Sequence, residues 1–296
     1  MGTLGSEISQ TLANCIVSAS LYALIGVGFG MIHRAGRFFH LAHGAVFTAG
    51  AYAAFLLFRS MSLPQWGALP VAMLLAAALG PVLWLLLYRP IRRRDGGPLA
   101  LLLGSLGANI VIQYTISLAF GDANLQIRTP FWGHTLHIGG AFVTYAQLAL
   151  VLLAIISCSL VAVVLRSTRL GVDLRAVGDD PFLAANVGID AERVLLWTLF
   201  SASLVVGAAG IVVALDTDMR PTMGLQSLLL GISASMLGGI GELRGLLAAA
   251  VVLGAAQHLG AWIVGIQWSE SFALLLLFLI LVLRPRGIQA YRRRAT

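Results

Sequence analysis

The sequence predicts an all-α, polytopic membrane protein that forms one bundle of about nine transmembrane helices. Hydrophobic residues make up 59% of the chain and charged residues only 10%, with a mean hydropathy of +0.91. Soluble proteins are about 45–50% apolar and about 25% charged. Backbone groups in lipid must pair internally, so a spanning chain forms helices or a closed barrel. Long continuous apolar runs favour helices over the alternating strands of a barrel.

Nine apolar segments approach the length of about 20 residues that crosses a bilayer. They are 11–31, 38–58, 68–88, 98–120, 142–165, 194–215, 223–241, 245–265 and 270–283. The weakest is 223–241, which is rich in Gly and Ser. The longest interruptions are 121–141 and 166–193. We therefore expect residues 1–296 to form a single transmembrane domain without a soluble insert.

Arginine placement predicts the orientation. The chain has no Lys, so all 19 basic residues are Arg, and with nine spans 16 of them fall in segments on one side. Only Arg59, Arg128 and Arg220 fall on the other side. The positive-inside rule then places the C-terminus in the cytoplasm and the N-terminus outside. If 223–241 were re-entrant, the C-terminal arginines would fall on the opposite side from those of 166–193, so the charge pattern favours a full crossing. The arginines then set the topology and need no nucleic-acid partner.

The interruption 166–193, which this topology makes cytoplasmic, contains the signals of a short helix. Asp180 suits the N-cap, Pro181 the first turn, and Gly188 a left-handed C′ position. The expected helix, 181–187, is about 10 Å long and presents Phe182 and Ala185 on one face. Such a short helix is unstable alone in water, so it needs a surface to dock on. That surface is either the bundle itself or a partner protein.

This loop resembles the cytoplasmic coupling loop of LivH-type branched-chain amino acid ABC permeases, R-A-x-x-x-D-x-x-x-A-x-x-x-G-I-[ND]. Every fixed position of that pattern is matched, by Arg175, Ala176, Asp180, Ala184, Gly188, Ile189 and Asp190. Residues 40–44 and 50–52 are similar to the family's N-x-A-H-G…G-A-Y segment, and 237–245 to its L-G-G-I-G-x-x-x-G, with Gly238, Gly239, Gly241 and Gly245 in place. This sequence departs from the pattern at His40, usually Asn, and at Glu242, usually a small polar residue.

The resemblance implies a permease subunit of an ATP-binding-cassette importer in a bacterial inner membrane. It implies ATPase subunits that carry ATP and Mg, a second permease subunit, identical or related, and an extracytoplasmic solute-binding protein that lands on the external segments 121–141 and 216–222. We expect no cofactor and no catalytic residue on this chain, because a Walker loop needs a Lys that is absent. The implied cargo is a branched-chain or other amino acid, with urea or short amides as the alternative.

Polar residues within spans form two stripes at helical spacing, and such residues usually face the bundle interior or a wet cavity. The candidate pathway residues are Asn14, Ser18 and Tyr22 in the first span, His43 and Gly44 in the second, and Ser105, Asn109 and Gln113 in the fourth. Each residue could equally serve interhelical hydrogen bonding. Two stripes together favour a hydrophilic pathway. The glycine-rich segments predict close helix contacts or hinges.

Two other function classes share this composition. An ion- or proton-coupled secondary transporter would normally carry a carboxylate inside the membrane, and the predicted spans have none at their centres. An intramembrane serine protease could pair Ser233 with His258 across two helices. A metal site at His40 and His43 lacks a third ligand nearby, and Cys15 and Cys158 lie in separate spans, so we predict no metal site or disulfide.

Overall fold

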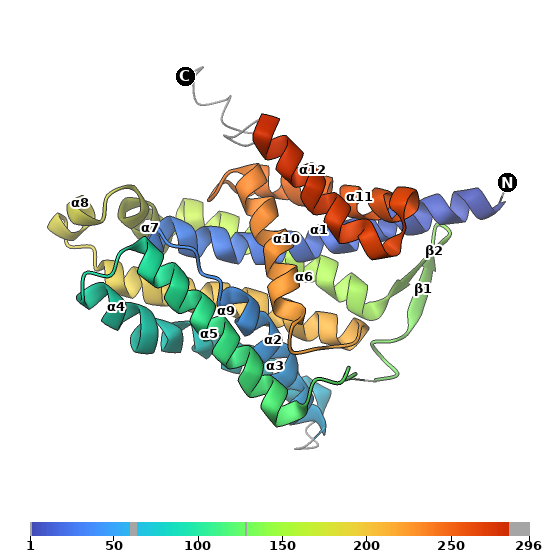
Figure 1. Ribbon diagram of the computed structural model, residues 1–296, viewed down its shortest axis with the longest axis horizontal. Coiled ribbons are helices and arrows are strands. Elements are labelled where there is room, and N and C mark those ends of the chain that lie inside the picture. Colours follow the sequence, from blue (N-terminus) through green and yellow to red (C-terminus); the bar gives the residue numbers. More distant parts are fainter. Residues whose placement is uncertain (1, 60–63, 128, 284–296) are drawn as a thin grey trace.

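The computed structural model is a helical bundle that describes residues 2–59, 64–127 and 129–283 (Figure 1). Its helices are α1 (Gly2–Gly36), α2 (His43–Arg59), α3 (Gln65–Leu83), a π-helix (Trp84–Tyr88), α4 (Arg89–Arg93), α5 (Pro98–Phe120), α6 (Tyr145–Ser167), α7 (Arg169–Asp179), α8 (Pro181–Asn186), α9 (Ala191–Asp216), α10 (Met223–Gly238), α11 (Leu243–Val264), a 3-10 turn (Ile266–Trp268) and α12 (Ser269–Leu283). Within these described ranges, six helical stretches are long and apolar enough to cross a membrane. They are α1, α3 continuing into α4, α5, α6, α9 and α11, and α10 is a shorter apolar helix.

Helix α1 is the centre of the bundle. Residues 22–32 of this helix are all buried, because α1 packs against α6, α9, α10 and α11. A helix that is apolar and buried on every side belongs in a core. The outer helices α5 and α6 instead expose apolar side chains, such as Leu118 and Leu160. Their exposed faces suit lipid or another membrane subunit better than water.

The predicted second span is helical only from His43 onward, and residues 37–42 form an irregular segment packed inside the bundle. Phe38, His40 and Ala42 in this segment are buried. A Cβ at Gly28 of α1 would lie 2.7 Å from His43 Nε2. Helix α2 therefore begins opposite an inner turn of α1, well before the end of α1 at Gly36. His40 and His43 are fully buried inside the protein instead of lying at the surface where the span would emerge.

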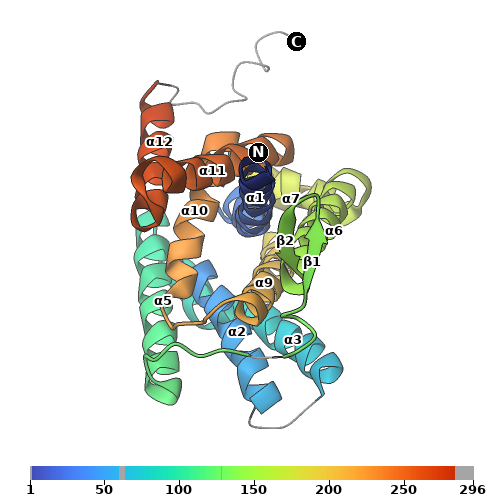
Figure 2. The same ribbon diagram turned by 90° about the vertical axis from the view of Figure 1, so that its right-hand side faces the viewer.

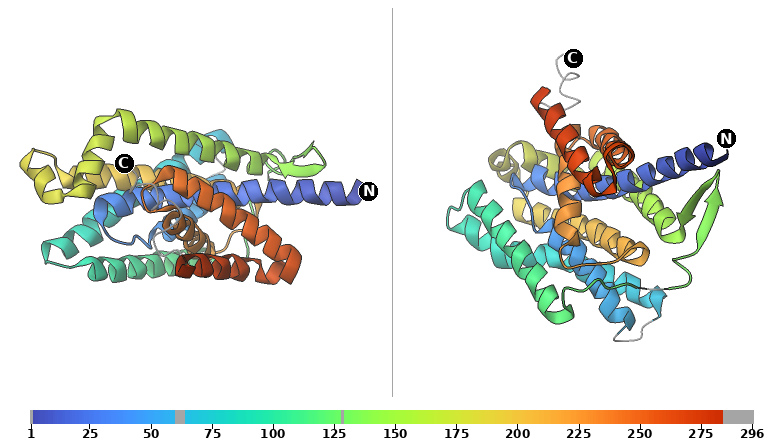
Figure 3. Two further views of the ribbon diagram at one scale, coloured as in Figure 1. Left: turned by 90° about the horizontal axis from the view of Figure 1, so that it is seen from above. Right: turned by 45° about the vertical axis from the view of Figure 1, so that its right-hand side comes forward.

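The predicted seventh span, 223–241, begins as a helix at its expected first residue, Met223. Residues 217–222 are largely irregular, and the 16-residue α10 follows them. Figures 1 and 3 show α10 crossing α1 at a steep angle instead of running alongside it. The helical part ends at Gly238, before the expected 241, because the glycine-rich turn to α11 begins there.

The starts of α2 and α10 touch each other at two glycines. A Cβ at Gly44 would lie 2.7 Å from the Gly224 carbonyl oxygen, and one at Gly224 would overlap the Gly44 carbonyl. The Gly224 N–H donates a 3.1 Å hydrogen bond to Thr48 Oγ1 on α2. Only glycine allows two backbones to approach this closely. Helices α2 and α10 are thus joined where they begin.

The all-α prediction omits one small hairpin, in which β1 (Thr135–Ile138) pairs antiparallel with β2 (Ala141–Thr144). Helix α6 starts at Tyr145 rather than 142, because Thr144 and Gln147 form a capping box. The hairpin and the N-terminus lie at one end of the long axis, and α4, α7 and α8 at the other (Figures 1 and 3). Arg128 and the arginines after 283 lie outside the described residues.

We expect Gly224→Ala to destabilise the fold by about 1–3 kcal/mol, the usual cost of overpacking, because its methyl group would overlap the Gly44 backbone. The matched control is Gly107→Ala on α5, where a Cβ meets nothing within 4 Å. The measurement is the melting temperature of the detergent-purified protein. Equal melting temperatures for the two variants would contradict the glycine contact.

Candidate functional site

A cavity of about 270 Å³ opens near the hairpin end of the bundle. Its walls come from α1, α2, α9, α10, α11 and the 217–222 segment, and Figure 2 shows α1, α2, α9 and α10 arranged as a ring in the view along the long axis. Its polar lining residues include Ser18, Tyr22, Asp218, Arg220, Gln226, Ser227 and Gln257, and its apolar ones Leu21, Phe47, Val213 and Leu230. Small-molecule sites start at about 300 Å³. The cavity lies just below that range, so it suits a solute smaller than a drug-sized ligand.

The polar stripe of α1 lies on this cavity and also contacts α11. Ser18 Oγ lies 2.9 Å from His258 Nε2, and the Tyr22 hydroxyl donates to Gln257 Oε1. Asn14, one turn further out, accepts a 3.1 Å hydrogen bond from Gln10 and does not line the cavity. Ser18 and Tyr22 thus line the cavity and also form interhelical hydrogen bonds, which are the two roles considered from the sequence. The partner of His258 is Ser18 rather than Ser233, so the protease-like pair is not formed.

The polar stripe of α5 lies elsewhere, in a buried network that holds the 37–42 segment. Ser105 Oγ accepts hydrogen bonds from the Ala42 N–H at 2.9 Å and from the Tyr88 hydroxyl at 3.1 Å. The same hydroxyl lies 2.7 Å from His40 Nδ1. Of the other stripe members, Asn109 is buried and Gln113 is half-buried. This stripe does not line the cavity; Ser105 instead fixes the segment that leads into α2.

His43 and Gly44 also lie away from the cavity lining, at the contacts of α2 with α1 and α10. The ring of His43 lies 5.6 Å from that of His40, centroid to centroid. Across residues 2–59, 64–127 and 129–283, no three His, Cys, Asp or Glu side chains gather as a metal site would require.

The rim of the cavity is the 217–222 segment, which is tied to residues 124–126. The Leu125 N–H donates to the Met219 carbonyl at 3.0 Å, and the Met219 N–H donates back at 2.8 Å. The Asp218 carboxylate accepts hydrogen bonds from the amides of Gln126 and Asn124. Sequence reasoning placed Asp218 in an external turn and assigned it no role. No spacing pattern could show that the turn folds back over a cavity.

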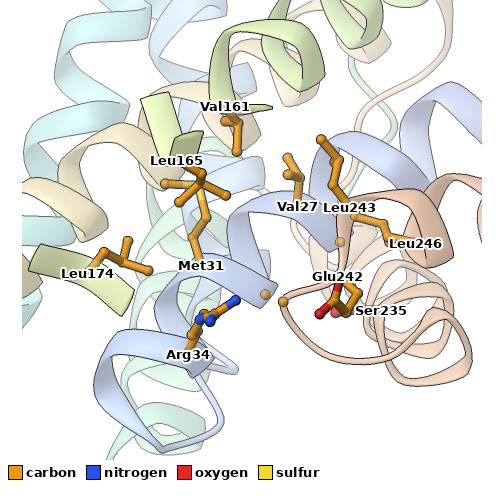
Figure 4. Close-up of a pocket in the computed structure, with 13 residues that line it drawn as sticks. Val27, Met31, Arg34, Val161, Leu165, Leu174, Ser235, Glu242, Leu243 and Leu246 are labelled. Carbon is orange, nitrogen blue, oxygen red and sulfur yellow. The ribbon is translucent and has the colours of Figure 1, made fainter. Parts of the chain in front are cut away.

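A much smaller cavity lies toward the opposite end of the bundle. The cavity there measures about 20 Å³, enough for roughly one water. It lies between α1, α6, α7 and the α10–α11 turn, and Figure 4 shows Arg34, Ser235 and Glu242 as its polar side chains among aliphatic ones. Of these two cavities, the one near the hairpin is thus the larger and the one beside α7 the smaller.

The glycine-rich motif forms the tight α10–α11 turn beside this small cavity. A Cβ at Gly238 or Gly245 would overlap the backbone of the other residue. Gly239 and Gly241 have φ angles of +94° and +83°, which L side chains rarely adopt. Each of these four glycines is therefore required by the backbone, either for a close approach or for a positive φ angle. The close approach agrees with the helix contact predicted from the sequence.

The 166–193 loop folds into α7 and α8. Asp180 caps α8 as predicted, with Oδ1 accepting from the N–H groups of Phe182 (2.9 Å) and Leu183 (3.1 Å), and Gly188 has φ +85°. The helix ends at Asn186, one residue before the expected 187. Ala184 is buried, whereas Phe182 is 75% exposed, as is Val187, and Leu183 is 60% exposed. Ala185 and Pro181 are also exposed, and Ile189 is half-buried.

Helix α7 was not predicted, and it anchors this loop to the bundle. The Arg37 guanidinium donates to the carbonyls of Gly178 (2.9 Å) and Asp179 (2.6 Å), the last residues of α7. Arg175 donates to the Leu165 carbonyl, which ties α7 back to α6. Ala176 is half-buried against the core. A basic side chain satisfies the free carbonyls of a helix C-terminus. Arg37 therefore connects the loop directly to the irregular segment before α2.

Residues 11–283 match the protein family described as "Branched-chain amino acid transport system / permease component". The chain belongs to this family. It is 26% identical to the high-affinity branched-chain amino acid transport system permease protein BraD of Pseudomonas aeruginosa, over 94% of each chain. It is also 26% identical to the LivH permease protein of that system in Escherichia coli K12, over 94% of each. The LivM permease protein of E. coli K12 is 24% identical over 95% of this chain and 70% of LivM.

This membership confirms the family predicted from the sequence. The chain is a multi-pass membrane permease component of a bacterial type of ABC transport system, and it is not the catalytic subunit. This sets aside the secondary transporter and the serine protease that composition alone left open.

We expect Asp180→Ala to destabilise α8 by about 1 kcal/mol, because two backbone N–H groups lose their acceptor. Amide hydrogen exchange in a peptide covering 181–187 should quicken several-fold. Asp180→Asn keeps a capping oxygen and should exchange as the wild type does. Unchanged exchange in the alanine variant would show that α8 does not depend on its cap.

Proposed function

We propose that this chain imports amino acids, branched-chain ones foremost, by alternating access driven by partner ATPase subunits. The observation that carries the proposal is the difference between the two ends of the bundle. A cavity of about 270 Å³ opens near the hairpin, while the cavity beside α7 has room for roughly one water. A transporter that never opens both ends at once must pass through such a state. The named activities of BraD and LivH support amino acids as the cargo.

The proposed topology has nine crossings, with the N-terminus outside and the C-terminus in the cytoplasm. It counts residues 37–42 with α2 as one crossing and α10 as another, and it leaves 217–222 on the external side. Arg34, Arg37 and the arginines of the 166–193 loop then share the cytoplasmic side with α7 and α8, as the positive-inside rule requires. Irregular backbone at membrane depth is tolerated where protein buries it, and the 37–42 segment is largely buried.

The ATPase subunits, which carry ATP and Mg, are proposed to bind the exposed apolar side of α8. Phe182, Leu183 and Val187 point away from the bundle, and at a cytoplasmic surface an apolar patch of this kind marks a protein contact. Ala184 holds the opposite side of α8 to the bundle. A groove on the partner that fits α8 could pull the loop without unfolding it.

Two further partners fit the remaining surfaces. A second permease subunit, identical or LivM-like, would cover part of the exposed apolar faces of α5 and α6, and lipid the rest. The likeness of this chain to both LivH and LivM supports such a pair. An extracytoplasmic binding protein would land on the hairpin and on the segments 121–141 and 216–222. Residues 217–222 line the cavity and are hydrogen-bonded to residues 124–126, so solute released there would lie beside it.

The test is uptake by proteoliposomes that contain this chain with its ATPase subunits, second permease and binding protein. We expect ATP-dependent accumulation of radiolabelled L-leucine, L-isoleucine and L-valine. Vesicles without ATP control for leakage. Accumulation of urea or acetamide without any amino acid would overturn the assigned cargo, and uptake driven by an ion gradient without ATP would overturn the mechanism.

A further inference from the structure

Arg220 is a cationic side chain on the cavity wall without an ionic partner. It lies in the 217–222 segment and lines the cavity. Among the residues that the structure describes, no carboxylate lies within 4.0 Å of its guanidinium. Its neighbour Asp218 is already engaged by the amides of Asn124 and Gln126. The charge of Arg220 is therefore available to a solute in the cavity.

The position of Arg220 is unusual for an arginine that only sets topology. In the proposed orientation it belongs to the external side, which holds three of the 19 arginines and which the positive-inside rule leaves poor in basic residues. Arg59 on the same side lies 5.6 Å above the Phe55 ring, a cation–π contact that accounts for it. Neither topology nor packing accounts for Arg220.

The start of α10 adds to the positive potential at this wall. Helix α10 begins three residues after Arg220, and its N-cap Thr222 makes no side-chain capping bond. Gln226 and Ser227, in its first turn and a half, line the cavity. A helix N-terminus carries a partial positive charge that favours anions. The first N–H groups of α10 are already paired, Gly224 with Thr48 and Met223 with the Arg220 carbonyl, so the group at this wall that can bind an anion directly is the Arg220 guanidinium.

The rest of the lining has a different character. Leu21 of α1, Phe47 of α2 and Leu230 of α10 contribute apolar surface to the same cavity. A solute held by an anionic group at Arg220 would have aliphatic surface within the cavity to pack against. Since the cavity is small, at about 270 Å³, the anionic group and the apolar part must belong to one small molecule.

We propose that Arg220 binds the carboxylate of the transported solute, and that the cavity takes aliphatic α-amino acids with their side chains against Leu21, Phe47 and Leu230. The inference rests on the proposed function and adds a specificity-determining residue to it. Arginine suits the role because its planar guanidinium forms two parallel hydrogen bonds with a carboxylate. A carboxylate is therefore required of the cargo, and a neutral amide of the same size is a poor ligand.

The test uses the assembled permease and ATPase complex without its binding protein, so that only the membrane cavity selects. Ser227→Cys, made with Cys15→Ser and Cys158→Ser, places a thiol on the cavity wall, and its rate of labelling by a neutral thiol reagent is measured. L-Leucine should protect this thiol, whereas L-leucinamide, which lacks the carboxylate, should not. Adding Arg220→Gln should raise the leucine concentration for half-protection by roughly tenfold to 100-fold. This is the loss of affinity expected when one charged hydrogen-bonded contact is removed.

Arg220→Lys keeps the charge and should recover part of the protection, while Arg59→Gln, the matched external arginine, should leave it unchanged. Equal protection by leucine and leucinamide, or the same half-protection value with and without Arg220, would overturn the inference. These outcomes are separate from the uptake test. If vesicles import leucine while leucine protects the thiol normally in the Arg220→Gln variant, only the role of Arg220 is wrong. If vesicles import no amino acid, the proposed function fails first.

Discussion

The contact between Gly44 and Gly224 is the constraint on which the rest of this structure depends. It fixes the starts of α2 and α10 against each other inside the bundle. Because α10 starts there at a steep angle to α1, its first residues and the 217–222 segment can line a cavity between α1, α9 and α11. A side chain at either glycine would force the two helices apart. The cavity and its rim both depend on this backbone approach.

The same contact gives the proposed coupling a physical path. Helix α8 is fixed to α7 through the cap at Asp180, and the last carbonyls of α7 are held by Arg37. Arg37 belongs to the segment that leads into α2, and α2 begins at the glycine contact with α10. A displacement of α8 by a partner can therefore reach the cavity wall through four packed elements without local unfolding. Ser105 and Tyr88 brace the segment from the side, so the displacement is passed on to α2 and not absorbed by a loose loop.

Sequence reasoning predicted the parts of this structure that depend on local chemistry. The bounds of α5 matched at both ends, and the cap, first-turn proline and left-handed glycine of α8 matched within one residue. It missed what depends on tertiary placement. Hydropathy cannot distinguish a continuous helical span from one that begins with an irregular segment such as 37–42, because buried irregular segments are equally apolar. It also grouped two polar stripes as one pathway, although Ser18 and Tyr22 face the cavity while Ser105 braces a loop. Arg220 carried no periodic signal, and only the fold places it on the cavity wall.

We propose that the cavity near the hairpin belongs to one conformation of an alternating pathway, and that α8 controls the change between conformations. The most direct measurement is labelling of Ser227→Cys, in the background free of other thiols, by a membrane-impermeant reagent added from outside the assembled transporter. Labelling is compared between the nucleotide-free complex and one trapped with a non-hydrolysable ATP analogue. The account predicts that the thiol is accessible in one nucleotide state and protected in the other, and that Arg37→Ala removes the difference. Equal labelling in both states of an intact, ATP-hydrolysing transporter would contradict it.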